Sequence, residues 1–307
     1  MQTERTEMNG KLNTPAQLCA VKRLQYAGGR AGGERVALVE NGVLSFTVLE
    51  DRALDLYDLR YRGQNISFLS KNGLCGFAGE YVGVFPGGML YTCGLDVIGG
   101  SATPVHGKIH NIPAEVESVL CDENGIEIIG TVRQSALFGE NLLLRRRIST
   151  KYGSGKLQID TEIVNEGARD TEYCLLFHIN FGYPFLDEGV KISAPLVKTI
   201  PRTPWASAHA AQCFEIGAPD ECEEQVFYHT VSRGEVELVN AKMGLRAGVR
   251  YDEKEMPALV EWKSMLAGDY ALGIEPSTTK MDDGFHLRRI RAGEVHRYPL
   301  TLEFGEI

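Results

Sequence analysis

The chain has 307 residues, a formal net charge of −9 and a hydrophobic content of 43%. This length permits one large domain or two average ones, and the hydrophobic content is sufficient for a large core. The negative charge argues against general binding to nucleic acid or to anionic membranes, because both require clustered lysine and arginine.

The start of the chain is polar and lacks the apolar segment of a signal peptide, and no apolar run is long enough to span a bilayer. We therefore expect a soluble, cytoplasmic protein with no membrane partner. The seven cysteines form no C-x-x-C pair. Their odd number and their scatter predict buried free thiols in a reducing compartment, with no zinc site and no disulfide framework.

The first distinctive segment is AGGRAGGERVAL, residues 27–38, which holds four glycines. It does not match the phosphate-binding pattern G-x-x-x-x-G-K-S/T, and no strand–helix–strand unit surrounds it. We interpret it as a loop that leads into a strand.

Most of the chain alternates between apolar and polar residues with a period of two, which is typical of strands that have one buried face. Turn residues such as ENG, YGSG and RAGE separate these segments, and no long helical period is present. The pattern predicts a single all-β domain over residues 1–307, a large antiparallel β-sandwich with about 1–15 loosely ordered. Segments that show the alternation are residues 42–63, 125–132, 156–164, 235–252 and 296–304.

The alternation lapses between residues 85 and 115, where His106 and His110 lie among glycines and prolines. Long irregular loops on a rigid β scaffold often carry function. A helical H-x-x-x-H metal site is disfavoured by Pro104 and Pro113. We expect at least one functional histidine here, and His106 before His110, because the adjacent Gly107 permits close approach of another group. The alternative is one core histidine and one surface histidine.

The stretch CLLFHINFGYPFLD, residues 174–187, places His178 after an apolar run and before a predicted turn. A histidine in this position is often a hydrogen-bonded core residue. The polar and aromatic residues that follow, including Asn180 and Phe181, instead indicate a place at the rim of a sheet. Histidine titrates near neutral pH and therefore suits proton transfer.

Glu275 ends another apolar run in YALGIEPSTTKMDDG, just before Pro276. A carboxylate at the end of a buried strand requires a partner or a raised pKa, and a general base near neutral pH requires the same environment. The alternative is a salt bridge to an arginine. Upstream, VEWKSM supplies Trp262 and Lys263 as candidate substrate-binding residues, although Trp262 is equally compatible with a place in the core.

These segments together resemble the aldose 1-epimerase (galactose mutarotase-like) superfamily, and more closely a branch of uncharacterised epimerase-related proteins. The resemblance lies in GGMLYTCGLD, HGKIHNIPAE, HINFGYPFLD and GIEPST, and it covers about residues 20 to 305. It implies a β-supersandwich fold and interconversion of the α and β anomers of a free sugar.

By this resemblance, His178 is the general acid that protonates the ring oxygen, and Glu275 is the general base that accepts the proton of the anomeric hydroxyl. His106 would hold the ring region of the substrate. Acid–base chemistry of this kind requires no metal and no cofactor.

At the other site residues, the chain matches the family pattern in some places and departs from it in others. Arg52 matches a region where related proteins place an arginine that faces the sugar, and its alternative is a surface arginine on a strand. Family members carry an asparagine directly before the histidine and another four residues after it, whereas this chain has Phe177 before His178 and Asn180 two residues after it. The acidic sugar-binding residue has no clear counterpart, and Asp96 and Asp187 are the nearest candidates.

Three functions therefore remain open: a mutarotase, a non-catalytic carbohydrate-binding or sensing protein on the same scaffold, and a sugar isomerase. The matched acid and base favour the mutarotase, because a binding protein requires neither. The expected partner is a small-molecule sugar, and the expected assembly is a monomer or a homodimer. Trp262 or Phe181 is expected to stack against the apolar face of the sugar.

Overall fold

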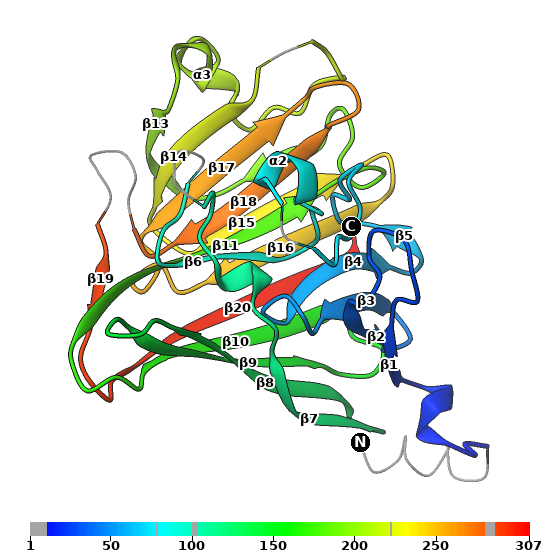
Figure 1. Cartoon of the computed structure of the whole chain (residues 1–307). Coiled ribbons are helices and arrows are strands. Elements are labelled where there is room, and N and C mark those ends of the chain that lie inside the picture. The colour runs from blue at the N-terminus through cyan, green and yellow to red at the C-terminus, as the bar shows by residue number, and fades with distance from the viewer. Residues whose placement is uncertain (1–10, 78, 100–103, 222, 280–285) are drawn as a thin grey trace.

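The computed structural model describes residues 11–77, 79–99, 104–221, 223–279 and 286–307 (Figure 1). Antiparallel strands dominate these residues and form three sheets. Most of the N-terminal segment that we expected to be loosely ordered lies outside the described residues. A short helix, η1 (Pro15–Gln17), begins at the last residue of that segment and is capped by Thr14.

The first sheet is a five-stranded meander in chain order. Its strands are β1 (Ala20–Gln25), β2 (Arg35–Glu40), β3 (Leu44–Leu49), β4 (Asp55–Tyr61) and β5 (Gln64–Asn65). The glycine-rich residues 27–33 form the connection between β1 and β2, which confirms the interpretation of a loop that leads into a strand.

The second sheet has eight strands, and its middle strands show the alternation that predicted them. In spatial order they are β12 (Lys191–Ser193), β15 (Glu235–Asn240), β16 (Leu245–Tyr251), β20 (Val295–Glu306), β10 (Lys156–Asn165), β9 (Asn141–Thr150), β8 (Gly125–Ser135) and β7 (Glu115–Asp122).

The third sheet has seven strands and carries the candidate site. In spatial order they are β13 (Leu196–Pro201), β14 (Gln225–Val231), β17 (Ala258–Ser264), β18 (Ala271–Ser277), β11 (Thr171–Phe181) and β19 (Arg288–Ile290), with β6 (Tyr91–Leu95) also paired to β11. Short helices lie in the connections: α2 (Tyr81–Val84), η2 (Ile109–Asn111), α3 (Pro204–Ala208) and η3 (Ala210–Gln212).

The main core joins the sheets, and it includes Phe46 of β3, Leu144 of β9, Phe177 of β11 and Leu300 of β20. A second apolar cluster covers the other face of the seven-stranded sheet and includes Phe68, Phe85, Tyr91, Leu176 and Val260. Both faces of this sheet are therefore buried around β11. Within the described residues, no helix is both long enough and apolar enough to cross a bilayer.

Burial on both faces explains two corrections to the sequence-based strand ends. A strand that is buried on both faces lacks the alternation that marks its length. β11 continues past His178 to Phe181, and β18 continues past Glu275 and Pro276 to Ser277. Both residues therefore lie inside strands and not at strand ends. Likewise, the segment 85–115 is not wholly irregular, because it contains the buried strand β6.

Candidate active site

A row of side chains crosses one face of the seven-stranded sheet and sets His178 opposite Glu275. The register pairs Leu176 with Ser277 and Ile179 with Ile274 on β11 and β18, so His178 and Glu275 occupy facing positions. On the other side of β11, His178 pairs with Tyr91 of β6, and beyond β18, Glu275 pairs with Val260 of β17. Directly opposed residues of antiparallel strands share a face and lie close together.

The His178 imidazole and the Glu275 carboxyl are in direct contact. His178 Nε2 lies 3.1 Å from Glu275 Oε1, and each residue is only 3% exposed. Burial lowers the pKa of His178 well below its ordinary value, and the nearby His106 lowers it further. Burial raises the pKa of Glu275 well above its ordinary value, while Arg202 acts in the opposite direction. The unliganded pair therefore favours a neutral imidazole beside a protonated carboxyl.

Aromatic rings surround His178. Its ring centroid lies 5.8 Å from that of Phe85, 5.6 Å from that of Trp262 and 5.5 Å from that of His106. Phe85 directly follows α2, and Tyr81 of α2 stacks on Phe85 at 4.9 Å. The expected convergence of His106, His178 and Glu275, with Trp262 beside them, is therefore present.

His106 reaches this cluster from the segment between β6 and η2 because its backbone is left-handed, with φ of +61°. The adjacent Gly107 also has positive φ, and an added Cβ there would lie 2.3 Å from the carbonyl oxygen of Gly94. Gly107 thus permits close approach of the β6 backbone, which fixes the segment against the sheet. Burial lowers the pKa of His106 to about 4, so this ring is neutral at neutral pH.

His110 supports the site from behind Tyr91. The two rings stack with centroids 4.4 Å apart, and burial lowers the pKa of His110 to about 3. On β11, the Asn180 amide donates to the carbonyl oxygen of Gly88 at 2.9 Å and lies on the same sheet face as His178.

Several buried polar atoms of this cluster lack a hydrogen-bond partner among the described residues. They are His178 Nδ1, Asn180 Oδ1, His110 Nδ1 and Glu275 Oε1, whose 3.1 Å contact with His178 Nε2 lacks the geometry of a hydrogen bond. Buried polar groups are nearly always hydrogen-bonded, so a concentration of unpaired ones indicates a place that a polar ligand or water completes. The absence of a side chain at Gly273 keeps this place open, because an added Cβ would lie 2.5 Å from Glu275 Oε1.

Two expected substrate-binding residues lie on the wrong side of the sheet. Phe181 is three residues from His178, so it points to the opposite face and packs against Phe185 in the main core. Lys263 follows Trp262 and also points away, and its ammonium donates to the carbonyl oxygens of residues 212, 213 and 215. Both predictions are wrong for the same physical reason, the period of two along a strand.

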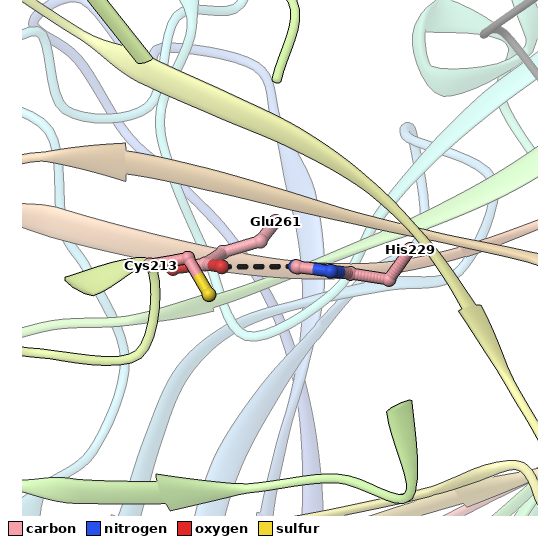
Figure 2. A group of neighbouring side chains, drawn as sticks. All are labelled: Cys213, His229 and Glu261. Atoms are coloured by element: carbon pink, nitrogen blue, oxygen red, sulfur yellow. Dashed lines mark hydrogen bonds and ion pairs between the residues drawn. The ribbon is translucent and has the colours of Figure 1, made fainter. Parts of the chain in front are cut away.

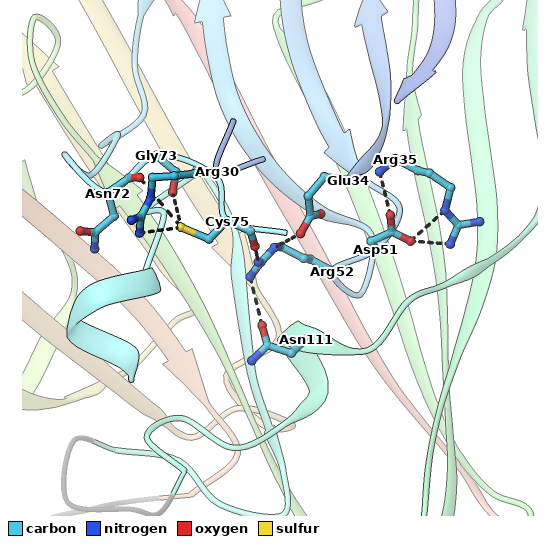
Figure 3. Close-up of polar contacts among 9 residues, drawn as sticks. All are labelled: Arg30, Glu34, Arg35, Asp51, Arg52, Asn72, Gly73, Cys75 and Asn111. Atoms are coloured by element: carbon cyan, nitrogen blue, oxygen red, sulfur yellow. Dashed lines mark hydrogen bonds and ion pairs between the residues drawn. The ribbon is translucent and has the colours of Figure 1, made fainter. Parts of the chain in front are cut away.

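Arg52 lies in a different place from the one expected (Figure 3). It is buried and lines a separate cleft of about 330 Å³, which neither His178 nor Glu275 lines. Its guanidinium binds Glu34 Oε1 at 3.1 Å, Asn111 Oδ1 at 3.0 Å and the carbonyl oxygen of Cys75. Arg52 therefore links two loops and the helix η2, and these partners occupy donors that were expected to face a sugar.

The two weak candidates for an acidic sugar-binding residue form other ion pairs. Asp96 pairs with Lys108 at 3.3 Å, and Asp187 pairs with Lys242 at 2.9 Å. Glu224, which the sequence did not single out, lies closer to the site: its Oε2 accepts from Trp262 Nε1 at 2.9 Å, and its Oε1 from Arg202 at 2.5 Å. The charges of Arg202 and Glu224 both shift the pKa of Glu275.

Sequence reasoning also missed Tyr81, Phe85 and Tyr91, whose rings enclose the histidines. Tyr91 lay within the motif GGMLYTCGLD, but nothing in the motif indicated its role. Arg202 and Glu224 come from β13–β14 connections that carry no recognisable signal.

The arrangement is chemically competent for proton transfer. It combines an acid and a base in contact, unpaired polar atoms and an aromatic enclosure. Enclosure of this kind strengthens electrostatic interactions and shifts pKa values away from their solution range.

The sheet arrangement defines this molecule as a galactose mutarotase-like β-supersandwich. A crystal structure described as "a putative aldose 1-epimerase from Klebsiella pneumoniae subsp. pneumoniae" matches with a TM-score of 0.82 at 21% identity, over 93% of this chain and 83% of that one. A galactose mutarotase-like protein from Clostridium acetobutylicum matches with a TM-score of 0.73 at 12% identity, over 95% and 100% of the two chains. At these identities, the likeness establishes the fold.

The chain belongs to the family described as "Domain of unknown function (DUF4432)", whose model matches residues 31–303. No curated protein matches the sequence. The likeness to galactose mutarotase-like proteins is therefore confirmed at the level of the fold, together with the all-β prediction.

Proposed function

We propose that this protein is an aldose 1-epimerase that interconverts the α and β anomers of a free sugar or sugar derivative. The observation that carries the proposal is the contact between His178 and Glu275, with unpaired polar atoms, inside an aromatic enclosure. A binding protein requires hydrogen-bonding groups but no acid–base pair with opposite pKa shifts.

The pair carries one exchangeable proton, and burial favours its location on Glu275. Glu275 is then the donor to the ring oxygen, and His178 Nε2 is the acceptor from the anomeric hydroxyl. This reverses the roles that the family resemblance implied, while the number of protons on the pair stays the same. The two assignments differ only in which side of the 3.1 Å contact holds the proton of the free enzyme.

The reaction then proceeds in balanced steps. Glu275 gives its proton to the ring oxygen as the bond between that oxygen and the anomeric carbon breaks. His178 takes the proton of the anomeric hydroxyl, and a carbonyl group forms. Rotation of the open chain and the reverse steps close the ring on either face. Both sugar oxygens are attached to the same carbon, so two neighbouring protein groups can serve them.

Substrate binding is assigned to the rim of the enclosure. Trp262 offers an aromatic face, while its indole nitrogen is held by Glu224. Arg202 and Glu224 are partly exposed and offer a donor and an acceptor for sugar hydroxyls. His106 and Asn180 lie beside His178 and complete the proposed polar contacts.

The direct test is exchange NMR on a panel of freshly dissolved aldoses, which measures the rate of anomer interconversion with and without protein. The variants Glu275→Gln and His178→Asn should each lose about 10²–10⁴-fold in kcat. The double variant should lose less than the product of the two factors, because groups that act as a unit are not additive.

Matched controls come from His296 and Glu294, a half-buried pair on and beside β20 whose Nε2–Oε1 distance is 3.5 Å. His296→Asn and Glu294→Gln should leave the exchange rate unchanged. A Glu275→Gln protein with undiminished exchange refutes the mechanism. If no aldose exchanges faster with wild-type protein than in buffer, the mutarotase proposal fails in favour of a carbohydrate-binding protein, and a new ketose signal would instead identify an isomerase.

A further inference from the structure

Figure 2 shows a second cluster of reactive side chains, Cys213, His229 and Glu261. The strand register places it on the opposite face of the seven-stranded sheet from His178. Cys213 follows η3, His229 lies on β14 and Glu261 lies on β17. The register pairs Phe227 with Glu261, and Trp262 alternates with Glu261 on β17. Glu261 and His229 therefore face away from the candidate active site.

The three side chains meet at one point. Their Sγ, imidazole nitrogen and carboxylate oxygen all lie within 4.8 Å of one another, and all three residues are buried. His229 Nε2 lies 3.0 Å from Glu261 Oε2. In the described part of the chain, this is the one place where three side chains of metal-ligand type gather so closely.

We propose that Cys213, His229 and Glu261 bind a zinc-like divalent transition-metal ion. Thiolate, imidazole and carboxylate are the ligand types that zinc takes in proteins, and three protein ligands leave a fourth position for water. The site is separate from the proposed sugar site, and it does not depend on the proposed function.

Neighbouring residues hold the three candidate ligands in place by hydrogen bonds, as they do in metal sites. Thr199 Oγ1 lies 2.9 Å from His229 Nδ1, which fixes the ring so that Nε2 faces Glu261. Lys263 holds the residues around Cys213 by donating to the carbonyl oxygens of Gln212 at 3.1 Å and of Cys213 at 2.6 Å. Partners of this kind orient the ligands and are energetically important to metal binding.

The charge of the cluster changes when a divalent ion binds. The Lys263 ammonium lies 3.8 Å from Glu261 Oε1, so it compensates the carboxylate while Cys213 is a neutral thiol. Metal binding displaces the thiol proton and adds two positive charges, which leaves one net positive charge over the ion, its two anionic ligands and Lys263. Metal uptake should therefore release a proton.

The experiment is titration of metal-free, full-length protein with cobalt(II), followed by absorption spectroscopy. A thiolate ligand gives a near-ultraviolet charge-transfer band, and four-coordinate geometry gives intense visible bands. We expect both bands to saturate at about one equivalent, with zinc then displacing the cobalt. Cys213→Ser should abolish the charge-transfer band.

Two further variants make the result specific. Thr199→Val keeps all three ligands but removes the partner of His229 Nδ1, and it should weaken metal affinity by about 10–100-fold. Cys121→Ser is the matched control, because Cys121 is not part of the cluster and forms a close thiol pair with Cys19, with sulfurs 3.5 Å apart. It should bind cobalt as the wild type does.

A wild-type protein that gives no saturable band refutes the proposal, and so does a band that survives in Cys213→Ser or disappears in Cys121→Ser. If Cys213→Ser fails to fold, the proposal is tested by measuring the thermal unfolding midpoint of wild-type protein with and without zinc. Added zinc must raise the unfolding midpoint of wild-type protein, since a ligand that binds the folded state stabilises it. No such rise in the wild type overturns the assignment.

Discussion

Arg146 offers the sharpest test of how the core supports the site. It is the central residue of three consecutive arginines on β9, and alternation turns it inward, where it is fully buried. Its guanidinium donates to Asp55 Oδ1 and Thr92 Oγ1 at 2.9 Å each, to the carbonyl oxygen of Ala53 and to Thr161 Oγ1. The same group lies 5.8 Å from the ring centroid of Phe177, the β11 residue that precedes His178.

Arg146→Met should lower the free energy of unfolding by about 3–5 kcal/mol, because the change leaves Asp55 as an uncompensated buried charge. Asp55 keeps only its contacts with the backbone nitrogen and the hydroxyl of Thr92. Urea unfolding, monitored by tryptophan fluorescence and circular dichroism, measures the difference.

The matched control is Arg147→Met, one residue along the same strand. Arg147 is 47% exposed and pairs with Glu127 and Asp160 at the surface, so its removal should cost less than about 1 kcal/mol. The double variant Asp55→Asn/Arg146→Met should lose less stability than the sum of its two single variants, because the partners share one network. An Arg146→Met protein within about 1 kcal/mol of the wild type would show that the buried pair is not a supporting element of the fold.

Three further outcomes are expected at the site. Gly273→Ala places a Cβ 2.5 Å from Glu275 Oε1 and 3.0 Å from His178 Cε1, so it should displace the pair and reduce kcat by about 10²-fold. The control is Gly248→Ala on β16, where an added Cβ lies 3.8 Å from its nearest atom. This variant should keep full activity. The pH profile of kcat/KM should show a broad plateau across neutral pH. The value falls on the acid side when the pair takes a second proton, on His178, whose pKa is lowered. It falls on the alkaline side when the pair loses its remaining proton from Glu275, whose pKa is raised. A single transition at the ordinary histidine pKa would contradict this reading, and long-range nitrogen NMR should find His178 neutral at pH 7. Trp262→Ala should raise KM by about tenfold, equivalent to about 1.4 kcal/mol, with kcat nearly unchanged. The control is Trp205→Ala, at the other tryptophan of the chain, which lies on α3 and should leave KM unchanged.

The sequence predicted strand bounds best where one face of the strand is exposed to solvent. Residues 156–164 alternate cleanly and lie within β10, as predicted. β11 and β18 are buried on both faces, so the end of an apolar run did not mark the end of the strand. The histidine and glutamate were identified correctly as neighbours, but their position inside strands required the three-dimensional register.

The misplaced residues divide into two kinds. The positions of Phe181 and Lys263 are explained by the alternation of side chains along a strand. Once β11 and β17 are known to be continuous strands, a residue at an odd spacing from His178 or Trp262 must face away from the candidate active site. Arg202 and Glu224 could not have been found in this way. They come from connecting segments, and only tertiary structure brings their charges near Glu275.

Glu261 and Cys213 could not be recognised as candidate metal ligands from the sequence for a related reason. They lie 48 positions apart, and each is an ordinary residue in its local sequence. Metal-ligand spacing is recognisable from sequence when ligands share one local motif, and it is lost when each comes from a different element.

Burial of β11 on both faces has a consequence for how this protein can change over evolutionary time. Phe177 and Ile179 pack in the main core, while His178 and Asn180 alternate with them and face the proposed active site. On the proposed function, a substitution along this segment alters folding and turnover at once, so neither property can change without the other. Novel specificities should arise instead from the rim, where Arg202 and Glu224 are partly exposed and can be exchanged at little cost to the scaffold.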